Sequence, residues 1–326
     1  MKASRNWSWP FSIIILLAIP LLFRDNNYYL HIFVLVAINI ILTASLRAIA
    51  SVGQISMGAM AFAGIGAYTS AILMKKMAFP FFVAFPLAGV ASMIAAAVIA
   101  YPFVRVTGIY FTMLTLFLGE VIRLIITEWT SMTGGSSGML KIPSIGSFSL
   151  SGINVDFIHL VPYCYLVFIL MALSLLFLYR IDRTQIGTTL EAIEKDEKVA
   201  ESVGINVIRF KVLIFCIGSF FMGLAGSLYA HHLRVLNPNS FGLFPSIYIM
   251  IYMVVGGRKR FSGSIIGALV LTLIPELSRT LKEYQPYVFA AVLFLVLFLL
   301  RQGLVDLVER IETLIAKGLG RRIERA

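Results

Sequence analysis

Long runs of apolar residues, separated by short polar segments, occupy most of this 326-residue chain. Ten runs approach the length of about 20 residues that a helix needs to cross a bilayer. They lie near 11–23, 29–46, 51–74, 80–101, 107–126, 157–179, 210–230, 244–256, 262–281 and 286–300. Because backbone groups in hydrocarbon must bond within their own segment, these runs predict helices. The pattern therefore predicts an all-α, polytopic membrane protein with about ten membrane segments.

Composition supports one membrane domain over residues 1–326. Apolar residues make up 59% of the chain and charged residues only 13%, whereas a soluble domain usually carries about 25% charged residues. No segment is both long enough and polar enough to form a separate soluble domain.

The net charge of +11 follows from basic clusters between the apolar runs. If the first run starts inside and each run crosses once, most of the 27 Lys and Arg residues fall on the inner side, as the positive-inside rule describes. This predicts cytoplasmic N- and C-termini, with 301–326 as a basic cytoplasmic tail. No aromatic stripe accompanies the basic residues, which argues against nucleic-acid binding.

Two connections differ from the rest. Segment 127–156 is rich in Gly and Ser and falls on the outer side, whereas 180–209 is strongly charged and falls on the inner side. In the second segment, Thr188 to Glu191 read as a capping box, and Gly204 is a natural stop. These signals predict a rigid, amphipathic cytoplasmic helix over 189–203.

The chain also contains a possible internal repeat. Residues 105–108 (Arg-Val-Thr-Gly) precede a Glu-x-x-Arg pair at 120–123, and 260–263 (Arg-Phe-Ser-Gly) precede another at 276–279. Both copies would run from inside to outside, so the repeat would be parallel, an arrangement found in transporters. Coincidence between two short matches is the alternative.

Polar and small residues inside the apolar runs are the candidates for a substrate pathway. Glu120 and Arg123 share one helix face and can form either a gate or an ion pair that holds helices together. The glycines of 51–73 either pack helices closely or mark a broken helix that lines a cavity. The candidate pathway residues are Gly53, Gln54, Ser56, Gly64, Tyr68, Thr115, Glu120, Arg123, Gly226 and Tyr229.

The motifs of an enzyme are missing from the chain. No Gly-x-x-x-x-Gly-Lys-Ser/Thr loop occurs, so this chain should not bind ATP by itself. The adjacent His231 and His232 have no ligand partners at metal-binding spacing, and Cys164 and Cys216 lie in apolar runs. The chain is therefore predicted to be no enzyme and to hold no metal.

Several segments together resemble a known family. They are Gly53-Gln54-Ile55-Ser56-Met57-Gly58 with 64–68, Thr115-Leu116 with 119–123 and 133–135, the block 187–232, and Arg301-Gln302-Gly303-Leu304. These segments are similar to signatures of the LivM-type permeases of branched-chain amino-acid ABC importers. The similarity runs from about residue 45 to residue 304, and the basic stretch 258–260 departs from a more neutral family pattern.

The resemblance implies a subunit of an ATP-driven importer in a bacterial or archaeal cytoplasmic membrane. Its partners would be a second, LivH-type permease, two cytoplasmic ATPases that hold ATP and Mg²⁺, and a periplasmic or extracellular substrate-binding protein. This chain would itself need no cofactor. The family's ATPase-contacting segment corresponds to 189–203, with Glu191, Ala192, Asp196, Glu197 and Gly204 as coupling residues.

Two other functions remain open. The chain could be a sister permease of the same fold that carries urea, amides or other small polar solutes. It could also be a secondary transporter that needs no ATPase.

Overall fold

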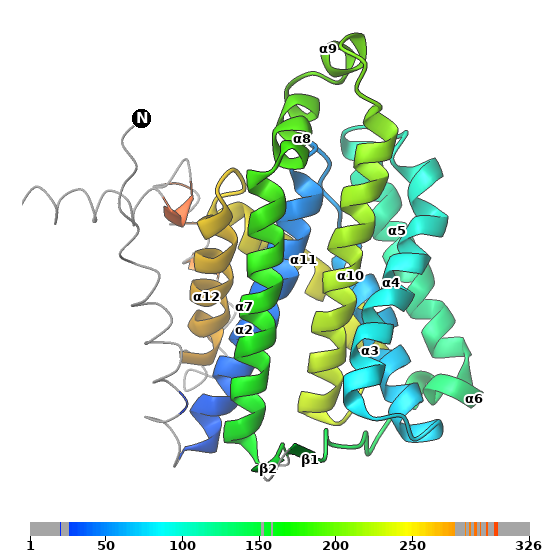
Figure 1. Cartoon of the computed structure of the whole chain (residues 1–326), viewed down its shortest axis with the longest axis vertical. Helices are drawn as coiled ribbons and strands as arrows, with labels where there is room; N and C mark the ends of the chain where they lie inside the picture. The colour runs from blue at the N-terminus through cyan, green and yellow to red at the C-terminus, as the bar shows by residue number, and fades with distance from the viewer. Residues whose placement is uncertain are drawn as a thin grey trace, which may run out of the picture.

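The computed structural model describes residues 26–150, 153–157 and 159–277, with Pro20 and scattered positions between 284 and 305. Its long helices are α2 (Asn27–Ala50), α3 (Ala59–Lys76), α4 (Phe81–Phe103), α5 (Ile109–Glu128), α7 (Leu160–Arg183), α10 (Val207–Leu233), α11 (Leu243–Gly256) and α12 (Phe261–Leu277). Shorter elements connect them: α6 (Thr130–Thr133), η1 (Gly135–Ser137), β1 (Ser147–Leu150), β2 (Ile153–Asp156), α8 (Gln185–Lys195), α9 (Glu197–Ser202) and η2 (Pro238–Phe241). Figure 1 shows the long helices as one bundle.

The predicted polytopic helical architecture is confirmed. Six segments of the described chain are long and apolar enough to cross a membrane: Asn27–Ala50, Phe81–Phe103, Ile109–Glu128, Leu160–Arg183, Val207–Leu233 and Pro238–Gly256. The predicted first segment, 11–23, and most of the last, 286–300, lie outside the described residues. The described part therefore supports six segments rather than the full count of about ten.

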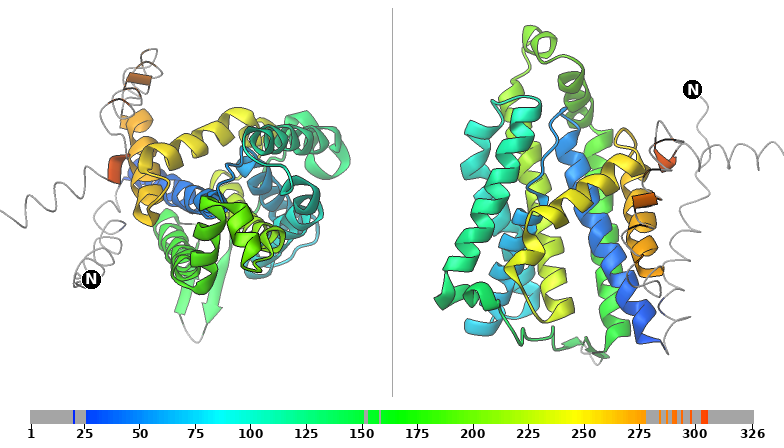
Figure 2. Two further views of the ribbon diagram at one scale, coloured as in Figure 1. Left: turned by 90° about the horizontal axis from the view of Figure 1, so that it is seen from above. Right: turned by 180° about the vertical axis from the view of Figure 1, so that it is seen from behind.

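Helix α10 is the centre of the bundle, and it packs against α2, α3 and α4. The two further views in Figure 2 show α2 in the middle of the bundle, with α7, α11 and α12 beside it. In the most apolar part of α2, 83% of residues are buried, against 28% in α4 and α5. The apolar residues on the outward sides of α4 and α5 therefore face the region that lipid would occupy.

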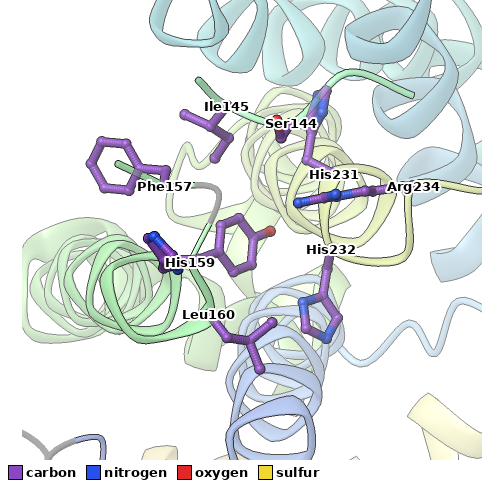
Figure 3. A pocket seen from close by; sticks show the side chains of 9 residues that line it. Ser144, Ile145, Phe157, His159, Leu160, His231, His232 and Arg234 are labelled. Atoms are coloured by element: carbon purple, nitrogen blue, oxygen red, sulfur yellow. The ribbon is translucent and has the colours of Figure 1, made fainter. Parts of the chain in front are cut away.

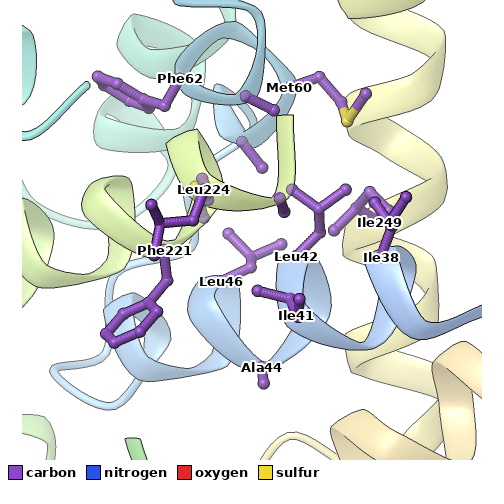
Figure 4. Close-up of a cluster of buried hydrophobic side chains, with 14 of the residues drawn as sticks. Ile38, Ile41, Leu42, Ala44, Leu46, Met60, Phe62, Phe221, Leu224 and Ile249 are labelled. Carbon is purple, nitrogen blue, oxygen red and sulfur yellow. The ribbon is translucent and has the colours of Figure 1, made fainter. Parts of the chain in front are cut away.

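The core is a single cluster of aliphatic and aromatic side chains. Figure 4 shows its centre, where Ile41, Leu42 and Leu46 of α2 meet Phe221 and Leu224 of α10. In the same helix, the Ser45 hydroxyl donates a hydrogen bond to the Ile41 carbonyl, and the Thr43 hydroxyl donates one to the Asn39 carbonyl. These two hydroxyls are thus satisfied within the helix, whereas Asn39 and Arg47 bond to Thr272 and Asp182 of other helices.

The run 51–74 is not one helix. After α2 ends, residues 51–58 are non-helical, Gly53 adopts a φ of +83°, and α3 begins only at Ala59. Hydropathy could not show this break, because the residues on both sides of it are apolar or small. The helix is therefore broken in the glycine-rich segment, and the lining of a cavity by this segment stays a prediction.

Helix α11 is short because the chain before it is irregular apart from the 3-10 turn η2. The backbone of Leu236 pairs with that of Met139 in an isolated antiparallel bridge, and η2 then leads to α11 at Leu243. The α11 helix runs toward the α8–α9 end, whereas α3 runs toward the β1–β2 end (Figures 1 and 2). These two interrupted helices therefore begin inside the bundle and point in opposite directions.

The outer connection 127–156 is more ordered than a plain glycine-rich loop. It contains α6, η1 and strand β1, which pairs with β2 in antiparallel register from Ser147↔Asp156 to Leu150↔Ile153. Gly138 is required where it lies, because a Cβ there would overlap the carbonyl oxygen of Leu236. This small hairpin is an exception to the all-α prediction.

The inner connection differs from the predicted single helix over 189–203. It forms two helices, α8 and α9, separated at Asp196, which has an extended backbone (φ −161°, ψ 111°). The capping box is wrong: α8 already begins at Gln185, and the Thr188 and Thr189 hydroxyls bond back to the Gln185 carbonyl. The predicted stop is confirmed, because Gly204 has a φ of +86°.

Candidate functional site

The two interrupted helices meet at their N-termini. The backbone N–H of Met60, in the first turn of α3, donates to the Ser246 hydroxyl of α11 at 3.3 Å, and both residues are buried. Helix N-termini carry unpaired N–H groups and partial positive charge. This junction is therefore the point inside the bundle where irregular backbone from both halves of the chain comes together.

Three of the predicted pathway residues hold the break before α3. The Gln54 amide donates to the carbonyls of Val104 and Val106 at 3.2 and 3.0 Å. The Met57 N–H donates to the Thr115 hydroxyl at 3.0 Å, and the Gly58 N–H donates to the Ser56 hydroxyl at 3.2 Å. Thr115 and Ser56 therefore satisfy N–H groups of the break, and Gln54 ties the break to the turn that follows α4.

A second group of predicted residues surrounds Phe241, which ends η2 just before α11. Its ring contacts Tyr68 of α3 and Tyr229 of α10, with ring centres 6.0 and 5.8 Å away. A Cβ on Gly64 would come within 3.1 Å of the Phe241 side chain, so the missing side chain makes room for this ring. The Tyr68 hydroxyl is buried without a hydrogen-bond partner among the described residues.

Gly226 lies where α3 and α10 approach most closely. A Cβ on Gly226 would overlap the carbonyl oxygen of Ala63, and one on Gly66 would overlap that of Gly223. Small residues serve this packing role in membrane helices, because they let two backbones touch.

The third group ties α5 to the re-entrant segment. Arg123 donates to Glu120 Oε1 from Nε at 2.8 Å and from a terminal nitrogen at 2.5 Å. Its other terminal nitrogen donates to Asn239 of η2 at 3.1 Å, and its stem covers Gly242 at the start of α11. The charged pair therefore holds the N-terminal side of α11 against α5, which is the ion-pair interpretation.

All ten predicted pathway residues thus belong to the junction or its supports, but they act there as packed and hydrogen-bonded groups. Gly53 begins the break, Gly64, Tyr68, Gly226 and Tyr229 pack beside it, and the Glu120–Arg123 pair fixes its far side. Their contact with a transported solute stays a prediction.

A cavity of about 270 Å³ lies at the opposite end of the bundle from α8 and α9. It is lined by Ser144, Ile145, Phe157, His159, Leu160, Tyr163, His231, His232 and Arg234. Figure 3 shows that His231 and His232 point in different directions, His231 toward Ser144 and His232 toward α2. Within the described chain, no group of three or more His, Cys, Asp or Glu side chains could hold a metal ion.

His231 belongs to a buried hydrogen-bond chain that sequence analysis missed. Ser227 donates to the Ser70 hydroxyl at 2.8 Å, and Ser70 is 2.8 Å from His231 Nε2. His231 Nδ1 is 3.0 Å from the Pro143 carbonyl, which can only accept, so Nδ1 carries the proton and Nε2 accepts from Ser70. The chain links α3, α10 and the outer connection. Because Ser70 is 157 residues from Ser227 and 161 from His231, local spacing gives no signal for this chain of bonds.

The α8–α9 pair, which we call the coupling segment (Gln185–Ser202), stands off one end of the bundle (Figure 1). Three of its apolar side chains, Leu190, Ile193 and Ala200, are buried against this chain and not available to a partner, whereas Val199 is exposed. Of the predicted coupling residues, Glu191 and Ala192 are exposed on α8. Asp196 instead caps α9 by accepting from the N–H groups of Lys198 and Val199, and Glu197 pairs with Lys211 at 2.6 Å.

A helical bundle with two interrupted helices meeting inside it, and a charged helical pair at one end, is the architecture of a membrane transport protein. The family model for the branched-chain amino acid transport system permease component matches residues 28–300. The chain therefore belongs to this permease family.

Its relatives include permease proteins of high-affinity branched-chain amino acid transport systems. LivM of Salmonella typhimurium is 30% identical over 273 residues, which cover 78% of this chain but less than two thirds (64%) of that protein. LivM of Escherichia coli is 29% identical, over 90% of this chain and 74% of the relative. LivH of Salmonella typhimurium is 27% identical, over 55% of this chain and 59% of the relative. No solved structure matches the chain.

Proposed function

We propose that this chain is a membrane-spanning permease subunit of an ATP-driven importer for branched-chain amino acids. The family match over residues 28–300 carries the proposal. The similarity to both LivM and LivH supports a pathway formed with a second, LivH-type permease. Two cytoplasmic ATPases would supply ATP and Mg²⁺, and a substrate-binding protein would deliver the amino acid.

The orientation in this proposal rests on charge. Most Lys and Arg residues of the described helices and turns lie toward the α8–α9 end: Arg47, Arg105, Arg180, Arg183, Lys195, Lys198, Arg209, Lys211, Arg258, Lys259 and Arg260. The opposite end has Lys75, Lys76, Lys141 and Arg234. This bias supports a cytoplasmic α8–α9 end and, with about ten segments in a single domain, cytoplasmic termini that include the basic tail 301–326.

The parallel repeat also stays a prediction. Helices α5 and α12, which contain its two copies, both run away from the α8–α9 end (Figures 1 and 2). Arg279, the last residue of the second copy, lies outside the described residues. An ion pair at 276–279 equivalent to that of Glu120 and Arg123, seen in an experimental structure, would support the repeat, and unrelated contacts there would contradict it.

Reconstitution tests the transport proposal. The complete complex in liposomes, with its binding protein, is expected to accumulate leucine only when ATP is present on the side of the ATPases. This chain alone is expected to accumulate none, because one subunit would supply only part of the pathway. ATP-independent accumulation by the chain alone would establish a secondary transporter, whereas ATP-driven uptake of urea or amides without leucine would establish the sister permease.

A cysteine at Ala192 tests both orientation and coupling, because Ala192 is exposed on α8. In a background where Cys164 and Cys216 are alanine, Ala192→Cys should react with a membrane-impermeant maleimide only in inside-out vesicles. Bound ATPases should protect it. Leu140→Cys, exposed at the opposite end, is the control: it should react only in right-side-out vesicles and should not be protected.

Two results would contradict this assignment. Reaction of Ala192→Cys in right-side-out vesicles would reverse the orientation, and unchanged reactivity in the assembled complex would remove α8 from the ATPase contact.

A further inference from the structure

The basic turn between α11 and α12 contacts the coupling segment. Arg258, the first cation of this turn, forms an ion pair with Glu194 near the end of α8. Both side chains are about one-third exposed. The neighbouring Lys259 is exposed at the surface of the turn. A positive-inside cluster that only set topology would need no such partner, so Arg258 has a more specific position than its role in topology demands.

Glu194 also lies beside a second turn. A Cβ on Gly53 would be in van der Waals contact with its Cγ, Cα and carbonyl oxygen, at 3.7–3.9 Å. Gly53, with its φ of +83°, lies in the non-helical stretch between α2 and α3. The end of α8 therefore lies against one turn and binds another through its carboxylate.

These two turns belong to the two interrupted helices. The Gly53 turn leads into the break before α3, and the Arg258 turn directly follows α11. The N-termini of the same two helices meet at the Met60–Ser246 hydrogen bond. Glu194 thus lies beside the connection that enters the junction and is paired with the one that leaves it, both on the coupling side.

The base of the coupling segment is anchored elsewhere. A Cβ on Gly187 would overlap the carbonyl of Asp182, so α7 turns tightly into α8. Asp182 pairs with the buried Arg47 of α2 at 2.6 Å, and Glu197 pairs with Lys211 of α10 at 2.6 Å. The supports from α7, α2 and α10 therefore hold the base of the coupling segment, and its Glu194 end faces the Gly53 and Arg258 turns.

We propose that Glu194 and Arg258 are positioning residues that couple movement of α8 to both interrupted helices, α3 and α11. The proposal rests on the proposed function, since it assumes ATPases that move the coupling segment. Its physical content is that one residue, Glu194, lies against the Gly53 turn and pairs with Arg258 of the other turn, so the two helices respond together.

The test uses the complete complex in liposomes and compares uptake with ATP hydrolysis. Glu194→Gln and Arg258→Gln should assemble and keep basal hydrolysis but lower the amount of leucine taken up per ATP at least tenfold. The exchanged pair Glu194→Arg with Arg258→Glu should restore most of this ratio, because the ion pair is rebuilt and the arginine stem can still cover Gly53. Lys259→Gln, the neighbouring exposed cation, is the matched control and should match the wild type.

The outcomes separate the two proposals. A wild-type complex without ATP-dependent uptake would overturn the proposed function. An active wild type with unchanged uptake per ATP in both neutral variants would overturn the Glu194–Arg258 link alone. If a neutral variant does not assemble, the exchanged pair decides: assembly without recovery of the uptake ratio overturns the link, and recovery supports it.

Discussion

Replacing Gly226 by alanine is expected to prevent stable packing of the helix bundle. The added Cβ would overlap the backbone carbonyl of Ala63, and a backbone atom cannot rotate away as the end of a side chain can. Alanine gains about 1 kcal/mol over glycine in helix propensity. Overpacking costs about 1–3 kcal/mol, and a contact between two backbones lies at the upper end of that range or beyond it. The overlap therefore outweighs the propensity gain.

The measurement is the melting temperature of the purified protein, together with its yield as a monodisperse peak in detergent. Gly119→Ala is the matched control, because a Cβ there would meet its nearest neighbours, Gly58 and Ala61, at 3.7–3.8 Å. That variant should be neutral or stabilised by up to about 1 kcal/mol. If Gly226→Ala has the yield and melting temperature of the wild type, α3 and α10 can move apart without a loss of stability, and the prediction is wrong.

Removing the carboxylate of Glu197 is expected to have the second large effect on stability. Its partner Lys211 is only 2% exposed, so Glu197→Gln leaves a buried ammonium without a counter-charge. Breaking a buried ion pair from one side costs about 3–5 kcal/mol. Because the Glu197 side chain is 37% exposed, solvent screening places the expected loss near the lower end of this range.

The double variant Glu197→Gln with Lys211→Met should recover most of the lost stability. It removes the uncompensated charge and keeps an apolar stem of similar length in the buried site. Lys198→Gln, an exposed neighbour in α9, should change stability by no more than about 0.5 kcal/mol. If the Glu197→Gln and Lys198→Gln variants unfold at the same temperature, the stability of the fold does not depend on the Lys211–Glu197 ion pair.

The long helices could be predicted from the sequence, because hydropathy alone determines which segments can stay in lipid. The breaks inside them could not. Residues 51–58 keep apolar and small residues between two apolar helices, and their irregular backbone is fixed across the fold: the Met57 N–H bonds to Thr115, and the Gln54 side chain bonds to the carbonyls of Val104 and Val106. The re-entrant segment before α11 likewise depends on a backbone bridge between Met139 and Leu236.

The coupling segment shows where local signals compete. Thr188 and Glu191 match a capping box, but the threonine hydroxyls bond back to Gln185, as they do inside helices. The side chain that does cap a helix in this segment is that of Asp196, at the start of α9. Glu197 and Lys198 follow it in the first turn of that helix. Asp196 and Glu197 read as exposed charges in sequence, whereas one caps α9 and the other compensates a cation buried on α10.

The position of α10 has a consequence for biosynthesis. Helices α2, α3 and α4 emerge from the ribosome first, yet each of them packs on α10, which begins only at Val207. The hydrogen-bond partners of the Ser70 hydroxyl, Ser227 and His231, are synthesised 157 and 161 residues later. During translation the early helices therefore enter the membrane with their glycine faces and this hydroxyl uncovered. The order in which the helices are made differs from the order in which the bundle closes.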